Sequence, residues 1–280
     1  MYSLRLVNNI GASIKLTQNE LNYQIVNISG LNPPTAEVYT TPIAFMDGGK
    51  YKSSKVQMRN MVITVRLNGA VEANRLLLYS ICRIGGFIRV YYENESRSVY
   101  VDGYIENIDN NPFSISEQIQ LSILCPQPYW KAATTLYYDV SQIVDGFTFP
   151  FAIEAAGIPF STIDNDRIVS IVNKGNVESG VIIEITANGN GIENLKLVHE
   201  NTGDYFIIET TLNADDVVRI NSYKGEKNIT INGESAFNVI GAGSNWLTLL
   251  AGDNTFSYTA DANPDLASVI FEVVEMYDGV

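Results

Sequence analysis

Few side chains of this sequence could perform catalysis, and histidine is the scarcest of them. His199 is the only histidine in 280 residues, so a catalytic relay or zinc site built on histidine would have to form around it. The pattern places it at the end of a strand, beside Glu200 and the turn 201–203, which favours a solvated histidine. The Gly-x-Ser-x-Gly, phosphate-loop, His-Glu-x-x-His and Cys-x-x-Cys motifs do not occur. We therefore predict a protein that is not an enzyme and has no cofactor.

Clustered carboxylates are the second possible source of chemistry. Segments 164–166, 215–216 and 261–265 each group Asp residues whose oxygens are the kind of ligand that calcium prefers. None has the spacing of a calcium loop, and Asp and Asn are common in turns, where they bond the local backbone. Turns are the favoured interpretation, and no metal site is predicted. A glycosidase-type carboxylate pair depends on separation in space, so a hydrolase is kept only as the least favoured alternative.

A carbohydrate-binding module is the main alternative. Sugar sites on β-sandwiches usually combine an aromatic platform with hydrogen-bonding side chains. Trp246 is the only tryptophan in the second half of the chain, and His199 with Asn201 loosely resembles the His-x-Asn of galectins. The Pro-Arg that continues the galectin motif is missing. A packed or interface tryptophan is the favoured interpretation, and the site Trp246, His199 and Asn201 is the lesser hypothesis.

The two cysteines, Cys82 and Cys125, lack the flanking pattern of a redox or zinc motif. A buried, reduced pair is the favoured interpretation, because a disulfide needs a geometry that the sequence does not give.

The composition limits the classes of partner. The net charge of −13 and the absence of any basic run argue against nucleic acid as a specific ligand. No apolar stretch of about 18 residues offers a membrane span. The first residues lack a basic and an apolar signal region, so we expect synthesis in the cytoplasm. A charged fraction of 18% with 16 tyrosines suits an all-β protein or a subunit of an assembly.

Segment 117–131 predicts a domain boundary. Apolar and mostly polar residues alternate along its first part, which is typical of a strand with one buried face. Pro126 and Pro128 then end the strand, because proline cannot donate to a ladder, and Tyr129 and Trp130 follow as large packing groups. Residues 1–131 hold 12 Lys and Arg against 10 Asp and Glu, whereas residues 132–280 hold 6 against 21. We predict an interdomain junction formed by Pro126, Pro128, Tyr129 and Trp130.

The elements on either side predict a mainly β protein. Domain 1–131 contains strands, one helix at 71–82 with Leu77, Leu78 and Ile81 as its apolar stripe, and a hairpin of 87–92 with 98–105. Segment 33–49 reads as extended, with little periodicity. Domain 132–280 begins with a connecting segment, 132–165, that contains the apolar but broken stretch 147–159. Short strands then recur about every ten residues, which predicts an antiparallel sandwich of eight to ten strands.

Several ordered segments together resemble a known family. In the first domain they are 8–14 with 28–31, 47–51 with 59–63, 103–106 read as a turn of the hairpin, and Cys125-Pro126-Gln127-Pro128-Tyr129-Trp130; in the second they are 172–180 and 250–254. On these segments the chain resembles the distal tail protein family of long-tailed phages, or prophages, of Gram-positive bacteria. The likeness spans nearly the full length, and the Cys-Pro-x-Pro-Tyr-aromatic segment is its most specific part.

The resemblance implies a structural subunit of the virion tail tip. Its N-terminal domain would form a homo-hexameric ring that joins the tail tube protein to the tail-associated protein below. Its C-terminal domain would be a galectin-like sandwich that anchors receptor-binding or baseplate proteins. The extended segment 33–49 would suit an arm that reaches a neighbouring subunit. The carbohydrate-binding alternative would then recognise the host cell wall.

Overall fold

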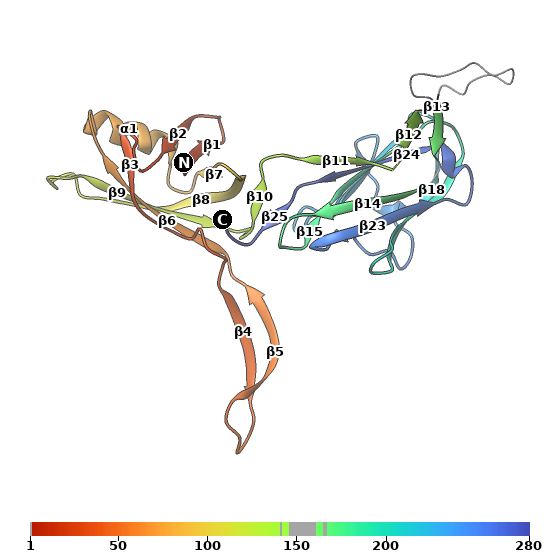
Figure 1. Ribbon diagram of the computed structural model, residues 1–280, viewed down its shortest axis with the longest axis horizontal. Helices are drawn as coiled ribbons and strands as arrows, with labels where there is room; N and C mark the ends of the chain where they lie inside the picture. The colour runs from red at the N-terminus through yellow and green to blue at the C-terminus, as the bar shows by residue number, and fades with distance from the viewer. Residues whose placement is uncertain (1, 141, 146–160, 165–166) are drawn as a thin grey trace. The chain divides into compact units, whose positions relative to one another are not determined.

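The computed structural model describes residues 2–140, 142–145, 161–164 and 167–280. The stretch 147–159 and two residues of the acidic cluster 164–166 lie outside this range. The chain forms two compact units, Met1–Thr134 with Met276–Val280, and Thr135–Glu275 (Figure 1). The last five residues, assigned to the second domain from the sequence, lie in the first unit, so the second unit is inserted into the first.

The first unit is built on one antiparallel sheet in the order β2-β1-β7-β8-β9-β6-β3, with β10 beside β8 and β25 beside β10. A bridge between Thr17 and Gln24 joins the two edges of this sheet, which closes it into an incomplete barrel. The strands are β1 (Ser3–Asn8), β2 (Ser13–Leu16), β3 (Tyr23–Ser29), β6 (Arg59–Leu67), β7 (Phe87–Glu93), β8 (Ser98–Asn110), β9 (Gln118–Cys125), β10 (Trp130–Ala132) and β25 (Met276–Tyr277).

Alternation along the strands creates the core of the first unit. In β6 and β9 every second residue is buried, and these apolar side chains form one cluster with those of β1, β2, β7 and β8. Helix α1 (Val71–Ile81) adds Leu78 and Ile81 to that cluster. The expected stripe was wrong at Leu77, which is 49% exposed. The buried third position is Asn74, whose side chain donates to the carbonyl of Asn68.

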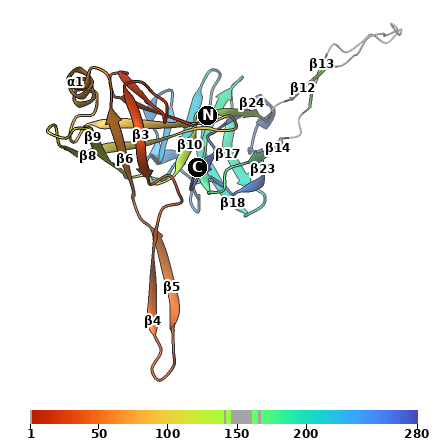
Figure 2. The same ribbon diagram turned by 60° about the vertical axis from the view of Figure 1, so that its left-hand side comes forward.

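Two parts of the first unit differ from the sequence expectation. Segment 33–49 was expected to be a single extended segment with little periodicity, and it contains β4 (Ala36–Pro42), which pairs with β5 (Gly49–Val56) in a hairpin. This hairpin pairs with no other strand of the described residues (Figures 1 and 2). Neither of its faces is buried, so its sequence shows no alternation of apolar and polar residues. Segment 103–106 was expected to be a turn, but it continues β8 through a register shift between Ile105 and Asn107.

The second unit is an antiparallel sandwich. A six-stranded sheet, β11-β24-β16-β19-β20-β21, and a four-stranded sheet, β14-β23-β17-β18, contribute to one apolar core. The pairs β15-β22 and β12-β13 are separate. The strands are β11 (Leu136–Asp139), β12 (Gln142–Asp145), β13 (Ser161–Asp164), β14 (Ile168–Asn173), β15 (Ser179–Gly180), β16 (Ile182–Ala187), β17 (Ile192–His199), β18 (Asp204–Leu212), β19 (Val217–Asn221), β20 (Asn228–Ile231), β21 (Glu234–Ser235), β22 (Thr248–Leu249), β23 (Gly252–Thr259) and β24 (Ala267–Val273).

The mainly β fold class is confirmed. Over the described residues the second unit holds only two single-turn 3-10 helices, Phe237–Val239 and Pro264–Leu266. Strand β22 spans only Thr248–Leu249, and β24 ends at Val273. The residues Met276 and Tyr277 that follow β24 pair with β10 in the first unit.

Candidate interaction site

Two of the predicted junction residues, Pro128 and Trp130, contact a buried arginine of the first unit. Arg59, the first residue of β6, is 2% exposed. Its Nε donates to the carbonyl of Pro128 at 2.6 Å, and Nη1 donates to the carbonyls of Gly30 and of Asn32, the latter at 2.7 Å. Nη2 donates to the carbonyl of Asp278 at 2.5 Å. One guanidinium therefore connects β6, the root of the hairpin, the segment that contains Pro128 and the returning C-terminal segment.

A guanidinium suits this position because its five donors lie in one rigid plane and keep their charge. Burial lowers the pKa of Arg59, but its ordinary value is so high that the group stays protonated. The four carbonyls come from loops and strand ends, and buried carbonyls need donors. The sequence contains only a weak signal for this role, because Arg59 was noted only as a member of segment 59–63, one of the segments that carry the family resemblance.

Trp130 belongs to the core of the first unit. It is fully buried, lies under the guanidinium of Arg59 at 5.4 Å, and contacts the ring of Tyr92 at 6.2 Å between centroids. Its backbone pairs with Tyr277. Pro126 is exposed, Pro128 is buried and Tyr129 is half-buried. The role of these residues as an interdomain junction stays a prediction; what the structure gives is their place in the first unit.

Gly30 fixes where the hairpin leaves the sheet. Its φ is +87°, and a Cβ there would lie 2.9 Å from the Cα of Met61 and closer still to the carbonyl oxygen of Asn60. Only glycine meets both demands. The chain therefore leaves β3 in one fixed direction, with the carbonyl of Gly30 held by Arg59.

The hairpin that follows carries apolar side chains into solvent. Every residue of β5 is exposed, and so are six of the seven residues of β4. At the tip the exposed fractions are 45% for Ile43, 108% for Phe45 and 68% for Met46. Phe45 also has a φ of +62°, which is an outlier for a bulky residue. A monomer gains nothing from this arrangement, so the hairpin is a candidate interaction arm.

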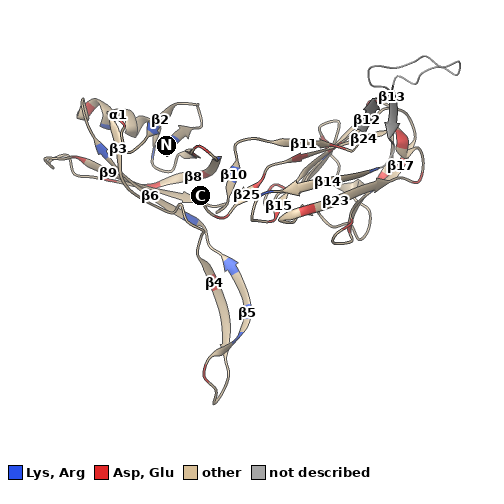
Figure 3. Ribbon diagram, viewed as in Figure 1, with Lys and Arg blue, Asp and Glu red and all other residues tan. Residues whose placement is uncertain are grey.

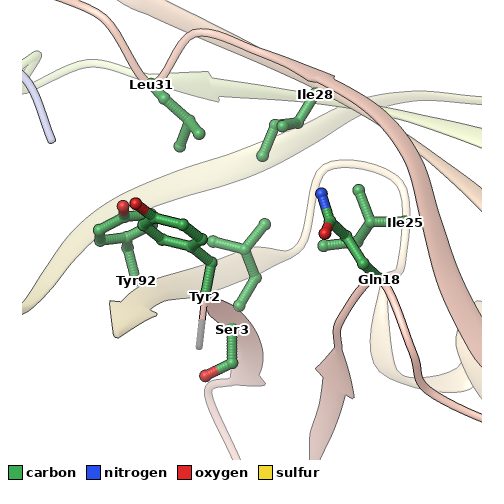
Figure 4. A pocket seen from close by; sticks show the side chains of 8 residues that line it. Tyr2, Ser3, Gln18, Ile25, Ile28, Leu31 and Tyr92 are labelled. Carbon is green, nitrogen blue, oxygen red and sulfur yellow. The ribbon is translucent and has the colours of Figure 1, made fainter. Parts of the chain in front are cut away.

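A second candidate surface is an apolar groove in the same unit, at the split of the barrel. Its volume is about 340 Å³, within the range of ligand pockets. Figure 4 shows side chains of β1, β3 and β7 gathered around it. The rings of Tyr2 and Tyr92 lie 6.2 Å apart along one side. The lining residues are Tyr2, Ser3, Leu4, Gln18, Ile25, Ile28, Leu31 and Tyr92.

His199 was expected to be solvated, and this is wrong. It ends β17 as expected, but it is 1% exposed and stacks on Phe256 with 4.5 Å between centroids. Nδ1 lies 3.2 Å from the hydroxyl of Thr202, whereas Nε2 has no partner among the described residues. Burial lowers the pKa of His199. The ring therefore serves as a neutral, flat packing group.

The other residues of the carbohydrate alternative also have local roles. The ring of Trp246 contacts Phe206 and Phe237 at 5.3 and 6.3 Å, and the Nζ of Lys227 lies 5.6 Å above it. The side-chain carbonyl of Asn201 accepts a bond from the backbone N–H of Thr255. An open stacking platform needs a free ring face. The sugar site stays a hypothesis that none of these contacts favours.

The acidic clusters within the described range have turn and pairing roles. The carboxylate of Asp216 accepts bonds from the backbone N–H of Asn213 and the side chain of Asn232, and these bonds lower its pKa. Asp265 pairs with Arg167 at 2.6 Å. Among the described residues, no group of three His, Cys, Asp or Glu side chains is arranged to hold a metal ion. No helix in that part of the chain is long and apolar enough to cross a membrane.

The two units differ in net charge. The first contains 12 basic and 11 acidic residues, and the second contains 6 and 20. Figure 3 shows Asp and Glu along the strands of the second unit.

Cys82 and Cys125 are free and buried in the first unit, and burial raises the pKa of each thiol to about 12.

Comparisons with known proteins agree with this architecture. Residues 174–273 match the family model of the siphovirus-type tail component, C-terminal domain. Among solved structures, the chain is similar to the Dit protein (gp 19.1) of phage SPP1, described as a paradigm of the hub adsorption apparatus in phages that infect Gram-positive bacteria. That likeness has a TM-score of 0.69 and 11% identity, and it covers 98% of each chain.

Two structures of the phage P2 baseplate in its activated conformation, with Ca and with Sr, match with TM-scores of 0.48 and identities of 13% and 12%. They cover 98–100% of this chain and 98–99% of theirs. No curated protein matches the sequence. The resemblance predicted from the sequence is thus confirmed: residues 174–273 match the model of the C-terminal domain of siphovirus-type tail components, and the chain has the fold of a Dit protein along nearly its whole length.

Proposed function

We propose that the protein is a structural subunit of a phage tail tip, without catalytic activity, that forms a hexameric ring hub. The ring would join the tail tube to the tail-associated protein and anchor receptor-binding or baseplate proteins. The observation that carries this proposal is the likeness to the SPP1 Dit fold, which covers 98% of this chain and therefore includes both units. The family match over residues 174–273 supports it independently.

The distribution of charge supports a division of labour between the units. The first unit is nearly neutral, so copies of it can pack around an axis without strong mutual repulsion. The second unit has a large negative net charge, and like charges are better separated. We assign ring formation to the first unit, and the peripheral position and the anchoring of other tail proteins to the second, which would be galectin-like in topology.

The hairpin β4–β5 supports assembly through an arm. An isolated two-stranded hairpin gains little stability in water on its own. Its exposed backbone and apolar tip gain burial only against another protein surface. An arm from each subunit to the next gives a head-to-tail contact, and such contacts generate closed rings when the rotation closes.

Native mass spectrometry of the purified protein over a range of concentrations tests the proposal, together with negative-stain imaging of assembled tails. We expect hexamers, single or stacked, at high concentration and a ring at the tail tip. A protein that is monomeric even in assembled tails would refute the hub. Cell-wall degradation by the purified protein would refute the assignment as non-catalytic.

A further inference from the structure

The outer face of the six-stranded sheet carries a charged cluster that the proposed hub does not use. Along β16, β19 and β24 the side chains alternate between the core and this face. Arg219 of β19 lies directly opposite Glu184 of β16, and Glu272 lies on β24, the strand on the other side of β16. Three charged side chains from three adjacent strands therefore meet on one surface of the second unit.

The guanidinium of Arg219 fixes the orientation of both carboxylates. Nη1 donates to Oε2 of Glu184 at 2.8 Å, and Nη2 donates to Oε2 of Glu272 at 2.7 Å. The other oxygen of each carboxylate and the Nε of Arg219 have no hydrogen-bond partner among the described residues. The cluster therefore presents two acceptors and one donor whose positions are already fixed, which lowers the entropic cost of binding a ligand.

An open aromatic ring lies beside this cluster. Tyr137 of β11 is paired in register with Glu272 of β24 (Figure 1). Its side chain is 67% exposed and makes no ring contact with the other described residues. Tyr137, Ile270 and the three charged side chains line a hollow of about 360 Å³, which is within the range of ligand pockets. The hollow thus combines a free aromatic ring, an aliphatic side chain and oriented polar groups.

The chemistry of the hollow favours a neutral sugar ring. Such a ring has an apolar face of C–H groups that can lie on an aromatic ring, and hydroxyls that both donate and accept hydrogen bonds. One Arg against two Glu gives the cluster a net charge of −1, in a unit with 6 basic and 20 acidic residues, so anions are repelled. The guanidinium between the carboxylates repels a metal ion, and a purely apolar ligand would leave the polar groups without partners.

We propose that this hollow is a binding site for a neutral saccharide, with the ring of Tyr137 stacked on one face of the sugar and the three charged side chains bonded to its hydroxyls. The site is distinct from the one considered at Trp246, whose ring lies against two phenylalanines. The inference goes beyond the proposed hub, because it gives the second unit a ligand of its own whether or not the first unit forms a ring.

Saturation-transfer NMR on the full chain tests the site, with glucose, galactose, mannose and N-acetylglucosamine as probes. We expect transfer to the ring C–H protons of at least one of them, and weaker binding of galacturonate than of galactose. Tyr137→Ala should weaken binding about tenfold or more, as loss of a central aromatic contact does. The matched control is Tyr51→Ala, because Tyr51 is 59% exposed in the first unit and should leave binding unchanged.

Two further variants complete the test. Arg219→Gln should also weaken binding, because it removes the group that orients both carboxylates, whereas Trp246→Ala should not. Tyr137→Ala should keep the wild-type unfolding midpoint, since its side chain is exposed. Absence of transfer to all four sugars, tighter binding of galacturonate than of galactose, or binding that is lost in Trp246→Ala and kept in Tyr137→Ala would overturn this inference. Each of these results leaves the hub intact, which native mass spectrometry tests separately.

Discussion

Replacement of Arg59 by Met is the most informative perturbation of the first unit. Met keeps the length and the apolar stem of the side chain but removes all five donors. The carbonyls of Pro128, Gly30, Asn32 and Asp278 then lose their shared partner in a buried position. The ring of Trp130 also loses the cation above it.

The magnitude follows from the kind of interaction. Four bonds from a charged donor, at about 1.5–3 kcal/mol each, give an upper bound that ignores water entering the site and the desolvation of the guanidinium. Each buried acceptor that loses its donor costs about 1–3 kcal/mol, and less where water can reach it. We expect about 4 kcal/mol of lost stability, a large fraction of what a single domain has, and a fall of about 15 °C in the unfolding midpoint of this unit.

The assay uses the position of the two tryptophans. Trp130 lies in the first unit and Trp246 in the second, so in a Trp246→Phe background the fluorescence reports the first unit alone. Thermal and urea unfolding would then compare Arg59→Met with Arg66→Met on the same strand. The side chain of Arg66 makes no hydrogen bond or ion pair with the described residues, and its replacement should cost less than about 1 kcal/mol.

Arg59→Lys separates charge from geometry. Lysine retains the positive charge, but one ammonium cannot donate to four carbonyls spread around a planar fork. We expect at least half of the loss seen with Met. If Arg59→Met lowers the midpoint no more than Arg66→Met does, or if Arg59→Lys is as stable as the wild type, the reasoning that this guanidinium holds the four carbonyls together and stabilises the first unit is wrong.

Three further predictions concern single sites. Gly103→Ala should cost about 2 kcal/mol in urea unfolding, because its Cβ would lie 2.8 Å from Ile123 Cγ2 and 2.9 Å from Cys125 Sγ. Burial holds the pKa of His199 below its ordinary 6.5. The unfolded state therefore binds the proton first, and stability should fall as the pH drops below 6.5; His199→Gln should flatten that slope in unfolding curves at several pH values. Cys82 and Cys125, with pKa values of about 12, should react with iodoacetamide only after unfolding, as mass spectrometry of labelled protein would show.

The sequence predicted the elements with one buried face and missed those without one. β6 and β9 alternate because one side of each packs on the core, and period-two patterning records that packing. The hairpin β4–β5 has no buried face, so nothing constrains its pattern. Gly103 was taken as a turn residue, but the close approach of Ile123 and Cys125 explains it; a glycine needed for space cannot be told from one needed for its φ without the neighbours.

The candidate sites show the same limit. Trp130 was expected at the joint, and its contacts lie within the core, because its partners Arg59 and Tyr92 come from distant parts of the chain. His199 has polar neighbours in sequence and an aromatic neighbour, Phe256, in space. Polar neighbours along a chain predict exposure only when no distant strand covers the residue.

The return of the chain to the first unit explains how the two units can have different roles. Trp130 pairs with Tyr277, so the strands that lead into and out of the second unit lie side by side. The backbone N–H of Val280 donates to Leu31, and Asp278 accepts from Arg59, so the returning segment also holds the root of the hairpin. Insertions are tolerated where their two ends are close. An acidic unit with adjacent ends can therefore change its surface without altering the sheet or the arm, and these are the parts that the proposed ring needs to keep.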